Sequence, residues 1–476
     1  MQSNHEAITL HHWDFAAALK AYGSTDTWQR YCADFEAHRL RGLPLVLSPL
    51  QLAELLCVRR SCALGEDMHP QCNIAFQWLI IRKALRRLYE MTENTGALYT
   101  THQIPKANGK MRTLHIPQPY LLSLQKKIRH YFLWAMPISR FATAYRRKQG
   151  LAENARTHVG KKVLLKLDIR NFFGSITFGM VLRSAFPSAL YPPAVGTLLA
   201  NLCCYKEALP QGAAPSPDLS NIVLFHFDET LGAWCERHGI NYTRYSDDMT
   251  FSGDFAPGYV IQKVEAMLQK YCFALNHPKT TVRRSGQRQS VTGITVNEKL
   301  RVDKQFRKEI RQEMHYCTRF GIDDHVRHRK ALHRFVEGEV VLWEHYCRHL
   351  LGRISHVLSV DAADGEMLHY RALLRRVLAE GHKLSSFQEE NAKIQQELAS
   401  CRRYGVPGHL LLSGRIIARN TFLDEMLLRM ETLWMCYPHT TELDEAHRWF
   451  SVKRKEYQFD EKTHESLGWQ GELLVL

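Results

Sequence analysis

The pattern of apolar and polar positions divides the chain into two helical ends and a strand-rich centre. Between Trp28 and Leu88 apolar residues recur at helical spacing, and the pair Ser48-Pro49 suits a helix cap and first turn. From Leu98 to Val302 short β-rich runs separated by turns replace that pattern. Helical periodicity returns beyond Lys304. The sequence therefore predicts an α+β fold, with strands gathered in a sheet and helices packed on it.

Individual runs define the expected elements and regions. The expected strands are Met111–Ile116, Val163–Ile169, Asn241–Tyr245, Met249–Phe251 and Val291–Val296. The helical pattern at the end of the chain breaks near Ser359–Gly365 and again near Tyr404–Gly408. We therefore expect four regions: 1–90 (helical), 91–303 (mixed), 304–381 (helical) and 382–476 (helical).

The composition of the chain indicates which classes of partner and which compartment to expect. The 476 residues include 63 Lys and Arg against 48 Asp and Glu, a net charge of +15, which favours a polyanionic partner such as nucleic acid. A solvated basic surface would give the same charge. The 12 cysteines form no CxxC pair and the N-terminus lacks an apolar signal segment, so we expect reduced thiols and a cytoplasmic protein. No apolar run is long enough to span a bilayer, so no membrane partner is expected.

Two places in the centre combine strands with acidic residues. The run Val163–Asp168 ends in an acid, and the turn within Asn241–Ser252 carries Asp247 and Asp248. Each signal alone is weak, because an Asp after a strand often caps a helix and acidic turns are common. Three carboxylates drawn together would repel by about 4 kcal/mol per close pair at an effective dielectric of roughly 20, which implies bound cations. Oxygen ligands suit Mg²⁺, and two such ions can promote nucleotidyl transfer.

The order of the motifs resembles that of a known enzyme family. Three of them resemble the palm motifs of reverse transcriptases: Asp168-x-x-x-Phe-Phe, Leu209-Pro-Gln-Gly212 and Tyr245-Ser-Asp-Asp248. Two more resemble elements of bacterial retron enzymes: Asn154-Ala-Arg-Thr-His158 and Val291-Thr-Gly293. The resemblance covers the region from Gln103 to Val360.

This resemblance implies a right-hand polymerase. Fingers and palm would occupy 91–303 and a helical thumb 304–381, between helical N-terminal and C-terminal extensions. Asp168 and Asp247 would ligate two Mg²⁺ ions, and Asp248 would complete the acidic site.

The resemblance also implies contacts with the incoming dNTP. Phe173 would be the steric gate beside the sugar, where an aromatic ring excludes a 2′-OH by volume; a core position is the alternative. Gln211 and Gly212 would support the template and the nucleotide, because glycine permits close backbone approach. Lys106, Lys110 and Arg112 lie in a run that resembles the fingers hairpin, where basic side chains clamp triphosphate oxygens. Arg112 can do so with two hydrogen bonds.

Other residues would contact RNA. Asn and His side chains can hydrogen-bond a 2′-OH or a base edge, and glycine permits close approach to a folded RNA. We therefore expect recognition of the RNA or its primer by Asn154, His158, Val291, Thr292 and Gly293, with structural roles as the alternative. On a thumb helix, Arg348 and Arg353 would face the backbone of an RNA–DNA duplex, unless they belong to a solvated basic face.

The function that the resemblance implies is RNA-directed DNA synthesis. The enzyme would copy a dedicated structured noncoding RNA from an RNA 2′-OH primer into a small RNA-linked DNA, in phage defence, with an effector protein as a further partner. The rivals are another bacterial defence reverse transcriptase, protein-primed or template-independent, and a noncatalytic RNA-binding scaffold. Region 382–476, in which Thr421–Tyr437 is an expected helix, would bind RNA, an effector or another copy, or extend the thumb. Oligomerisation is left open.

Overall fold

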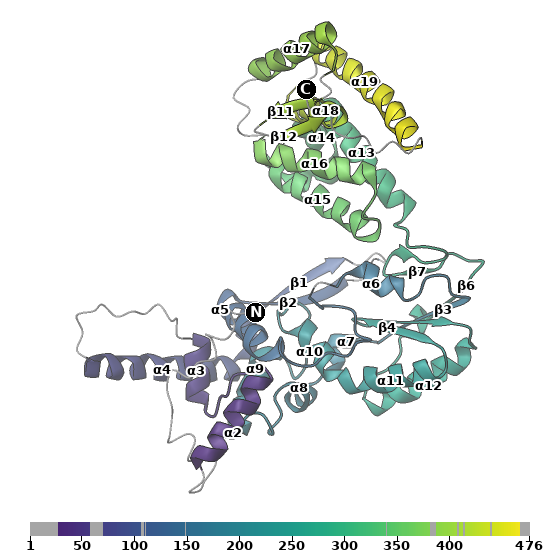
Figure 1. Ribbon diagram of the computed structural model, residues 1–476. Coiled ribbons are helices and arrows are strands. Elements are labelled where there is room, and N and C mark those ends of the chain that lie inside the picture. The colour runs from purple at the N-terminus through teal and green to yellow at the C-terminus, as the bar shows by residue number, and fades with distance from the viewer. Residues whose placement is uncertain are drawn as a thin grey trace. The chain divides into compact units, whose positions relative to one another are not determined.

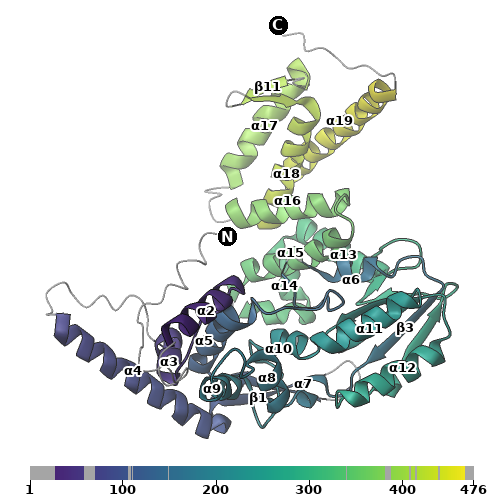
Figure 2. The same cartoon turned by 60° about the horizontal axis from the view of Figure 1, so that its bottom comes forward.

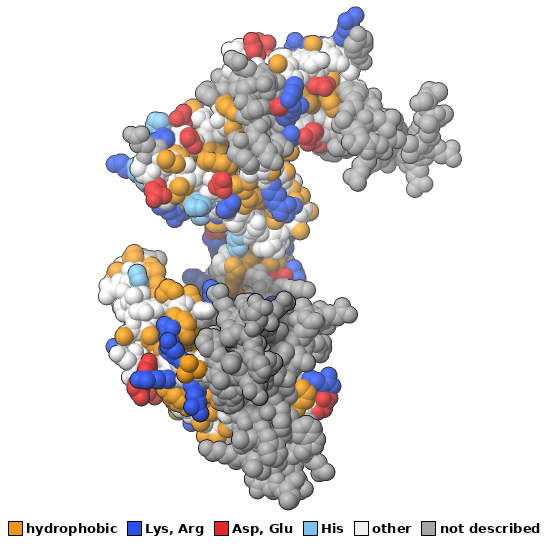
Figure 3. Space-filling view, turned by 90° about the vertical axis from the view of Figure 1, so that its left-hand side faces the viewer, with side chains coloured by type: hydrophobic (Ala, Val, Ile, Leu, Met, Phe, Trp, Pro, Cys, Tyr) orange, Lys and Arg blue, Asp and Glu red, His pale blue; other side chains and the backbone are white. Residues whose placement is uncertain are grey.

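The computed structural model divides the chain into two compact units, residues 1–292 with 296–299 and residues 293–295 with 300–476. We call them the N-terminal unit and the C-terminal unit (Figures 1 and 2). On the face drawn in Figure 3, Lys and Arg side chains are spread over the described parts of both units. The structure describes residues 27–57, 70–105, 109, 111–147, 149–338, 340–380, 387–406, 409–412, 415–437 and 440–466. None of the helices in these ranges is long and apolar enough to cross a membrane.

A four-stranded antiparallel sheet forms the centre of the N-terminal unit. Its order is β4 (Asn241–Tyr245), β5 (Asp248–Gly253), β3 (Val163–Asp168) and β6 (Thr281–Arg284). β3 is an inner strand, and its residues Leu164, Leu165 and Leu167 are no more than 1% exposed. Helices α11 (Phe225–Arg237) and α12 (Pro257–Lys270) lie along one face of the sheet (Figures 1 and 2). These strands and helices confirm the predicted α+β fold class.

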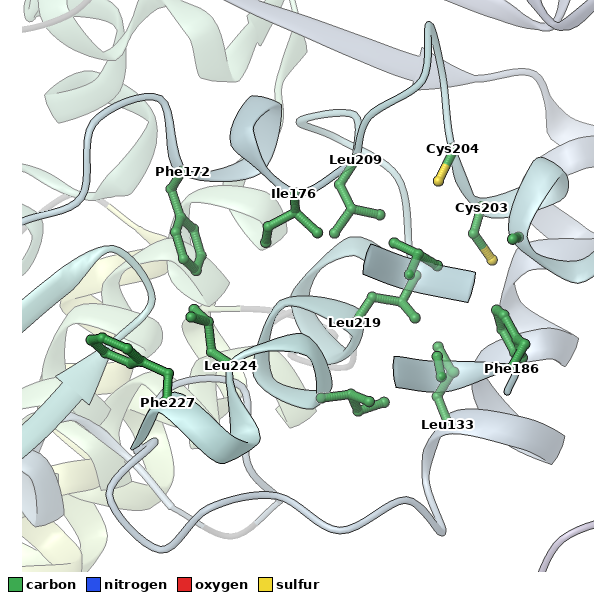
Figure 4. Close-up of a cluster of buried hydrophobic side chains, with 14 of the residues drawn as sticks. Leu133, Phe172, Ile176, Phe186, Cys203, Cys204, Leu209, Leu219, Leu224 and Phe227 are labelled. Atoms are coloured by element: carbon green, nitrogen blue, oxygen red, sulfur yellow. The ribbon is translucent and has the colours of Figure 1, made fainter. Parts of the chain in front are cut away.

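Further helices extend the core of this unit. They are α2 (Thr27–Leu40), α3 (Pro49–Cys57), α4 (Pro70–Glu93), α5 (Pro119–Ile128), α6 (Leu151–Arg156), α7 (Phe172–Ser175), α8 (Phe178–Ala185), α9 (Pro193–Cys203) and α10 (Ser216–Val223). Figure 4 shows part of the core, in which side chains of α7, α9, α10 and α11 meet. α3 begins as predicted, because the Ser48 hydroxyl accepts a hydrogen bond from the backbone N–H of Gln51 at 3.3 Å. A separate antiparallel hairpin consists of β1 (Tyr99–Pro105) and β2 (Met111–Pro117).

The C-terminal unit is mainly helical. Its helices are α13 (Lys304–Phe320), α14 (Ile322–His328), α15 (Trp343–Val360), α16 (Gly365–Glu380), α17 (Phe387–Tyr404), α18 (Arg419–Cys436) and α19 (Thr441–Ser466). The gaps after α15 and α17 confirm the two predicted breaks in the helical pattern. One hydrophobic core joins α13 to α16, and a second joins α17, α18 and α19. α18 belongs to both cores, since Met435 packs in the first and Met430 in the second.

Two predicted elements differ from the structure. Region 382–476 was expected to be helical almost throughout, but β11 (His409–Leu412) pairs with β12 (Arg415–Ala418) in an antiparallel hairpin. Short apolar runs of this kind suit a strand as well as a helix. The run Val291–Val296 was expected to be one strand, but Thr292 and Gly293 have φ angles of 47° and 86°. This left-handed turn divides the run into β7 (Ser290–Val291) and β8 (Ile294–Thr295). A third short strand pair is β9 (Val336–Glu337) with β10 (Val340–Val341).

Candidate active site

Strand pairing brings the three acids to one end of the sheet. β3 pairs with β5 so that Asp168 lies directly opposite Asp248, and the backbone N–H of Ile169 donates to the carbonyl of Asp247 at 3.0 Å. Between β4 and β5 the turn is Ser246-Asp247, in which Ser246 has a left-handed φ of 62°. Turns with positive φ match the twist of hairpin strands. Sheet register therefore brings the distant Asp168 to the adjacent pair Asp247 and Asp248.

The cluster of carboxylates is partly buried and mutually repulsive. Burial raises the pKa of Asp247, and the charges of Asp168 and Asp248 raise it further. Burial also raises the pKa of Asp248; the charge of Lys166 opposes this shift and that of Asp168 adds to it. A raised pKa means that the folded protein holds the ionised carboxylate at a cost, which a bound cation would remove.

Two residues that the sequence analysis missed hold Asp168. The Asp168 carboxylate is buried and accepts hydrogen bonds from Asn276 Nδ2 at 2.7 Å and Lys279 Nζ at 2.6 Å. Burial acts to lower the pKa of Lys279, but the hydrogen bond to Asp168 and the acidic charges raise it overall. The backbone N–H of Asn276 also donates to the Asp168 carbonyl, at 2.8 Å, so this segment lies beside the end of β3. The only sequence signal is a polar turn before β6, which does not identify a partner 111 residues away.

The donor set of the cluster fits a hard divalent cation. Carboxylate oxygens, which Asp168, Asp247 and Asp248 provide, are the ligands that Mg²⁺ prefers. Within the described ranges, no three Asp, Glu, His or Cys side chains converge as a formed metal site, and Lys279 supplies the positive charge next to Asp168. A cation at Asp168 would share this carboxylate with the Lys279 ammonium or displace it.

A buried ion pair supports the turn that carries Asp247. Arg244 is fully buried, and its guanidinium donates to the two carboxylate oxygens of Asp228 at 2.9 and 2.6 Å. Its remaining terminal nitrogen, Nη1, donates to the carbonyl of Ser246 at 3.0 Å. The hydroxyl of Tyr242 also donates to Asp228, at 2.8 Å. The ion pair thereby fixes the backbone immediately before the acidic pair.

The adjacent residues Phe172 and Phe173 on α7 have different environments. Phe172 is 3% exposed, and Figure 4 shows its ring pointing into the core toward Leu224 and Phe227. Phe173 is half-buried, and its ring packs edge to face on Phe172 with 5.2 Å between the ring centroids. Phe172 is therefore the core residue of the pair, and Phe173 keeps a partly exposed ring that suits the expected steric gate.

The loop with Gln211 and Gly212 packs on β2. The backbone N–H of His115 donates to the Gln211 carbonyl at 2.7 Å. Gly212 has a φ of 119°, and a Cβ added there would lie 2.9 Å from the His115 carbonyl oxygen. The backbone of β2 thus already requires glycine at this position. The expected close approach of Gly212 to the substrate stays a prediction. The side chain of Gln211 is half-buried beside this contact.

The basic residues of the β1–β2 hairpin are only partly described. Arg112 lies on β2 opposite Ile104, and its side chain is exposed, as a triphosphate ligand needs. Lys106 and Lys110 lie outside the described residues.

Asn154 and His158 are buried in the N-terminal unit, which contradicts direct RNA contact. Neither has any exposed surface. The two ring nitrogens of His158 bond the hydroxyls of Ser252 at 2.7 Å and Thr243 at 2.8 Å. Burial, and the charge of Lys161, lower the pKa of His158 to about 3, so the ring is neutral at pH 7. The side chain joins α6 and its following turn to β4 and β5, so its role is structural.

We predict that His158→Ala lowers stability rather than RNA selectivity. The change leaves two buried hydroxyls without a partner and opens a cavity, which should cost roughly 3 kcal/mol of unfolding free energy. DNA synthesis should fall equally on a native structured RNA and on a generic primed template. Urea denaturation and primer extension measure the two effects. The exposed His277→Ala is the matched control, with stability expected within about 0.5 kcal/mol of wild type. A loss confined to the native RNA would restore the recognition role.

The second retron-type element is partly buried as well. Val291 has no exposed surface, and α6 contacts β7, so the two elements lie together. Val291 therefore packs inside the protein and does not reach RNA. Thr292 is half-buried and Gly293 is exposed at the turn. The Thr292 hydroxyl is buried without a partner, so Gly293 is the residue of this element that stays exposed for the expected RNA contact.

The two expected thumb arginines also differ from each other. Arg348 is exposed on α15 and pairs with Glu344 at 3.0 Å, a weak surface contact that a phosphate can replace. Arg353 pairs with Glu309 at 2.8 Å, and its guanidinium carbon lies 4.7 Å from the centroid of the Phe306 ring. Its side chain is only 17% exposed, so Arg353 serves the packing of α15 on α13 rather than a duplex.

An open basic cavity lies on the sheet beside the acids. It has a volume of about 560 Å³, and its lining residues are Lys166, Thr281, Arg283, Arg288 and Ser290. Lys166 lies two residues before Asp168 on β3, so both side chains belong to one face of the sheet. Thr281 lies opposite Lys166 across the β3–β6 pair. The sheet thus presents cationic side chains next to the acids on the same face, which suits the phosphates of a nucleic acid strand.

Comparisons with known proteins find reverse transcriptases. Residues 104–311 match the family described as reverse transcriptase (RNA-dependent DNA polymerase). The retron Mx65 reverse transcriptase of Myxococcus xanthus is 34% identical over 262 residues, 50% of this chain and 61% of that enzyme. The retron Ec86 reverse transcriptase of Escherichia coli is 30% identical over 250 residues, 52% of this chain and 78% of that enzyme. The match to the Mx65 enzyme thus covers less than two thirds of its length.

The chain is only weakly similar to a solved telomerase structure. The telomerase of Candida albicans in complex with a fragment of telomeric RNA aligns with a TM-score of 0.35 and 9% identity, over 74% of this chain and 66% of that one. This similarity is too weak to establish a shared fold. All three acids lie within residues 104–311, whereas α14 to α19 lie outside the family match.

Proposed function

Because the chain belongs to the bacterial retron-type reverse transcriptases, we propose that it is an RNA-directed DNA polymerase that copies a dedicated structured noncoding RNA. The observation that carries this proposal is the meeting of Asp168, Asp247 and Asp248 at one end of the β3–β5 pair. These carboxylates would hold two Mg²⁺ ions. Such ions lower the pKa of an attacking hydroxyl and neutralise a leaving pyrophosphate.

The proposed reaction needs little covalent chemistry from the protein. The terminal hydroxyl of the growing strand loses its proton to water and attacks the α-phosphorus of a dNTP, a phosphodiester bond forms, and the bond to pyrophosphate breaks. Lys279 would compensate the charge of Asp168 until the cations bind, since its Nζ is 2.6 Å from the carboxylate. Arg112 would bind triphosphate oxygens, and Gln211 would contact the template or the dNTP. The cavity beside Lys166 would hold backbone phosphates of the primer strand.

The primer, product and biological role are finer parts of the same proposal. We expect an RNA 2′-OH as primer, a small RNA-linked DNA as product, and a role in phage defence with an effector protein. The test is to purify the chain with its bound nucleic acid. That nucleic acid is then sequenced before and after enzymatic debranching. A DNA that is released from RNA only by cleavage of a 2′,5′ linkage supports the proposal.

Other products would favour the rivals. DNA joined to the protein would indicate protein priming, and DNA without an RNA complement would indicate template-independent synthesis. RNA binding without polymerase activity on any primed template would indicate a noncatalytic scaffold.

Substitution of Phe173 tests the steric gate. We predict that Phe173→Val raises the incorporation of rNTPs relative to dNTPs by about 10-fold to 100-fold, because the smaller side chain leaves space for the 2′-OH. The measurement is single-nucleotide extension on one primed template. Phe173→Tyr keeps the ring and is the matched control. An unchanged ratio in a folded, active Phe173→Val variant would assign Phe173 to the core.

A further inference from the structure

A pocket in the C-terminal unit lies far along the chain from the acids. It has a volume of about 530 Å³ and is formed where α13 ends and α14 begins. Gly321 makes the junction, with a φ of 82° that favours glycine. Aromatic and polar side chains line the pocket, among them Gln312, Tyr316, Phe320, His325, His328 and Arg329. A volume of this size accommodates a small planar ligand.

Three rings of the pocket form one stack. The centroids of His325 and Tyr316 are 5.5 Å apart with 15° between the planes, and those of Tyr316 and Phe320 are 6.0 Å apart with 27° between the planes. Phe320 is the outer ring of the stack and is 52% exposed. An aromatic ring that is open to solvent at the end of a stack can accept another planar group.

Buried polar contacts fix the inner end of the stack. His325 Nε2 bonds Glu313 at 3.0 Å, and both residues are buried. The hydroxyl of Tyr346 and the guanidinium of Arg329 donate to the same carboxylate. Although burial acts to raise the pKa of Glu313, these partners lower it to about 2, so Glu313 is ionised at pH 7. The stack is therefore held in place before any ligand binds.

The charges around the stack suit a nucleotide. Arg329 and His328 line the pocket, and the guanidinium carbon of Arg319 lies 5.8 Å from the centroid of the Phe320 ring. Asp324 also lines the pocket and would repel a free phosphate ion, whereas its carboxylate can accept hydrogen bonds from a base. These basic and acidic side chains together suit a flat, hydrogen-bonding ligand whose phosphates lie away from Asp324.

We propose that this pocket binds an unpaired nucleobase of the RNA, stacked on Phe320, with the neighbouring phosphates near Arg319 and Arg329. The inference rests on the proposed function, which requires a structured RNA partner. Bases in loops and bulges are free to leave their own stacks and to pack on aromatic side chains, whereas duplex bases are not. The pocket would thus select RNA by its single-stranded elements.

The test uses the full chain and two RNA probes of equal length. One is a hairpin with an unpaired loop that carries 5-iodouridine, and the other is a fully paired duplex. Phe320→Ala should weaken binding of the loop RNA by about 10-fold and leave duplex binding unchanged, because stacking on one base is lost. Phe320→Trp keeps a stacking surface and should bind like wild type. Photocrosslinking should place the iodinated base on the peptide that spans Gln312 to Arg329.

Two outcomes would overturn the proposal. One is unchanged loop binding by a folded Phe320→Ala variant, and the other is a crosslink that lies wholly elsewhere in the chain. Unchanged RNA binding with loss of a protein partner would assign the pocket to that protein instead. DNA synthesis by Phe320→Ala on a generic primed template separates this inference from the proposed function, since that activity should persist even if the pocket binds no RNA.

Discussion

Replacing Asp247 with Asn is expected to reduce DNA synthesis by about 1,000-fold or more while RNA binding stays close to wild type. Loss of a metal ligand removes several kcal/mol of transition-state stabilisation. The basic surface that holds phosphates is unchanged by the substitution. Primer extension and filter binding measure the two properties on the same preparation.

The variant should also remain folded. The pKa of Asp247 is raised in the folded chain, so its ionised form destabilises the metal-free protein, and a neutral side chain removes that cost. Asp254→Asn is the matched control, because Asp254 is exposed and pairs only at the surface with Lys162. Near-wild-type synthesis by Asp247→Asn would refute the metal-ligand assignment.

The second large effect is expected at the buried ion pair beneath the same turn. Asp228→Leu leaves the guanidinium of Arg244 buried without its carboxylate, which should cost about 3 to 5 kcal/mol of unfolding free energy. Chemical denaturation measures the loss. The exposed pair Arg140 and Glu236 provides the control, since Glu236→Leu should change stability by less than about 1 kcal/mol.

A combined variant separates stability from positioning. Asp228→Leu, Arg244→Met and Tyr242→Phe together remove the buried charges and the Tyr242 hydroxyl, so part of the stability should return. The buried Asn221 Oδ1, which accepts from Arg244 at 3.2 Å, loses that donor. Synthesis should stay low, because the Ser246 carbonyl no longer has the Arg244 donor that fixes the turn. A combined variant that polymerises like wild type would show that the ion pair supports the fold alone.

Local sequence was sufficient to predict the strands of the acidic site. β4 has the predicted bounds Asn241–Tyr245, and β3 ends at Asp168, one residue before the predicted end. β4 and β5 combine β-branched and aromatic residues with a tight acidic turn, whereas β3 is a mainly apolar run that ends in an acid. Such signals need no knowledge of distant partners. The right-hand polymerase class was also predicted from local sequence, by the order of the motifs along the chain. Membership of the reverse transcriptase family confirms that class.

Partners distant in sequence could not be predicted. Lys279 is a lone basic residue in a turn until the β3–β6 pairing brings it to Asp168. His158 was expected at the RNA because its side chain can bond a 2′-OH, but hydroxyls of Ser252 and Thr243 on two strands satisfy both ring nitrogens. Whether a polar side chain faces solvent or a neighbouring strand depends on tertiary packing, which residue type alone does not determine.

The helix α18 has a consequence for how such a chain can evolve. It supplies Met435 to the core of α13–α16 and Met430 to the core of α17–α19. A deletion of region 382–476 would remove the core of α17–α19. It would also expose apolar side chains of the α13–α16 core, because Met435 packs there. If a lineage gained this region by fusion, the packing of Met435 would make the gain difficult to reverse without compensating substitutions. Genes of this kind would then keep the region even where its original benefit had disappeared.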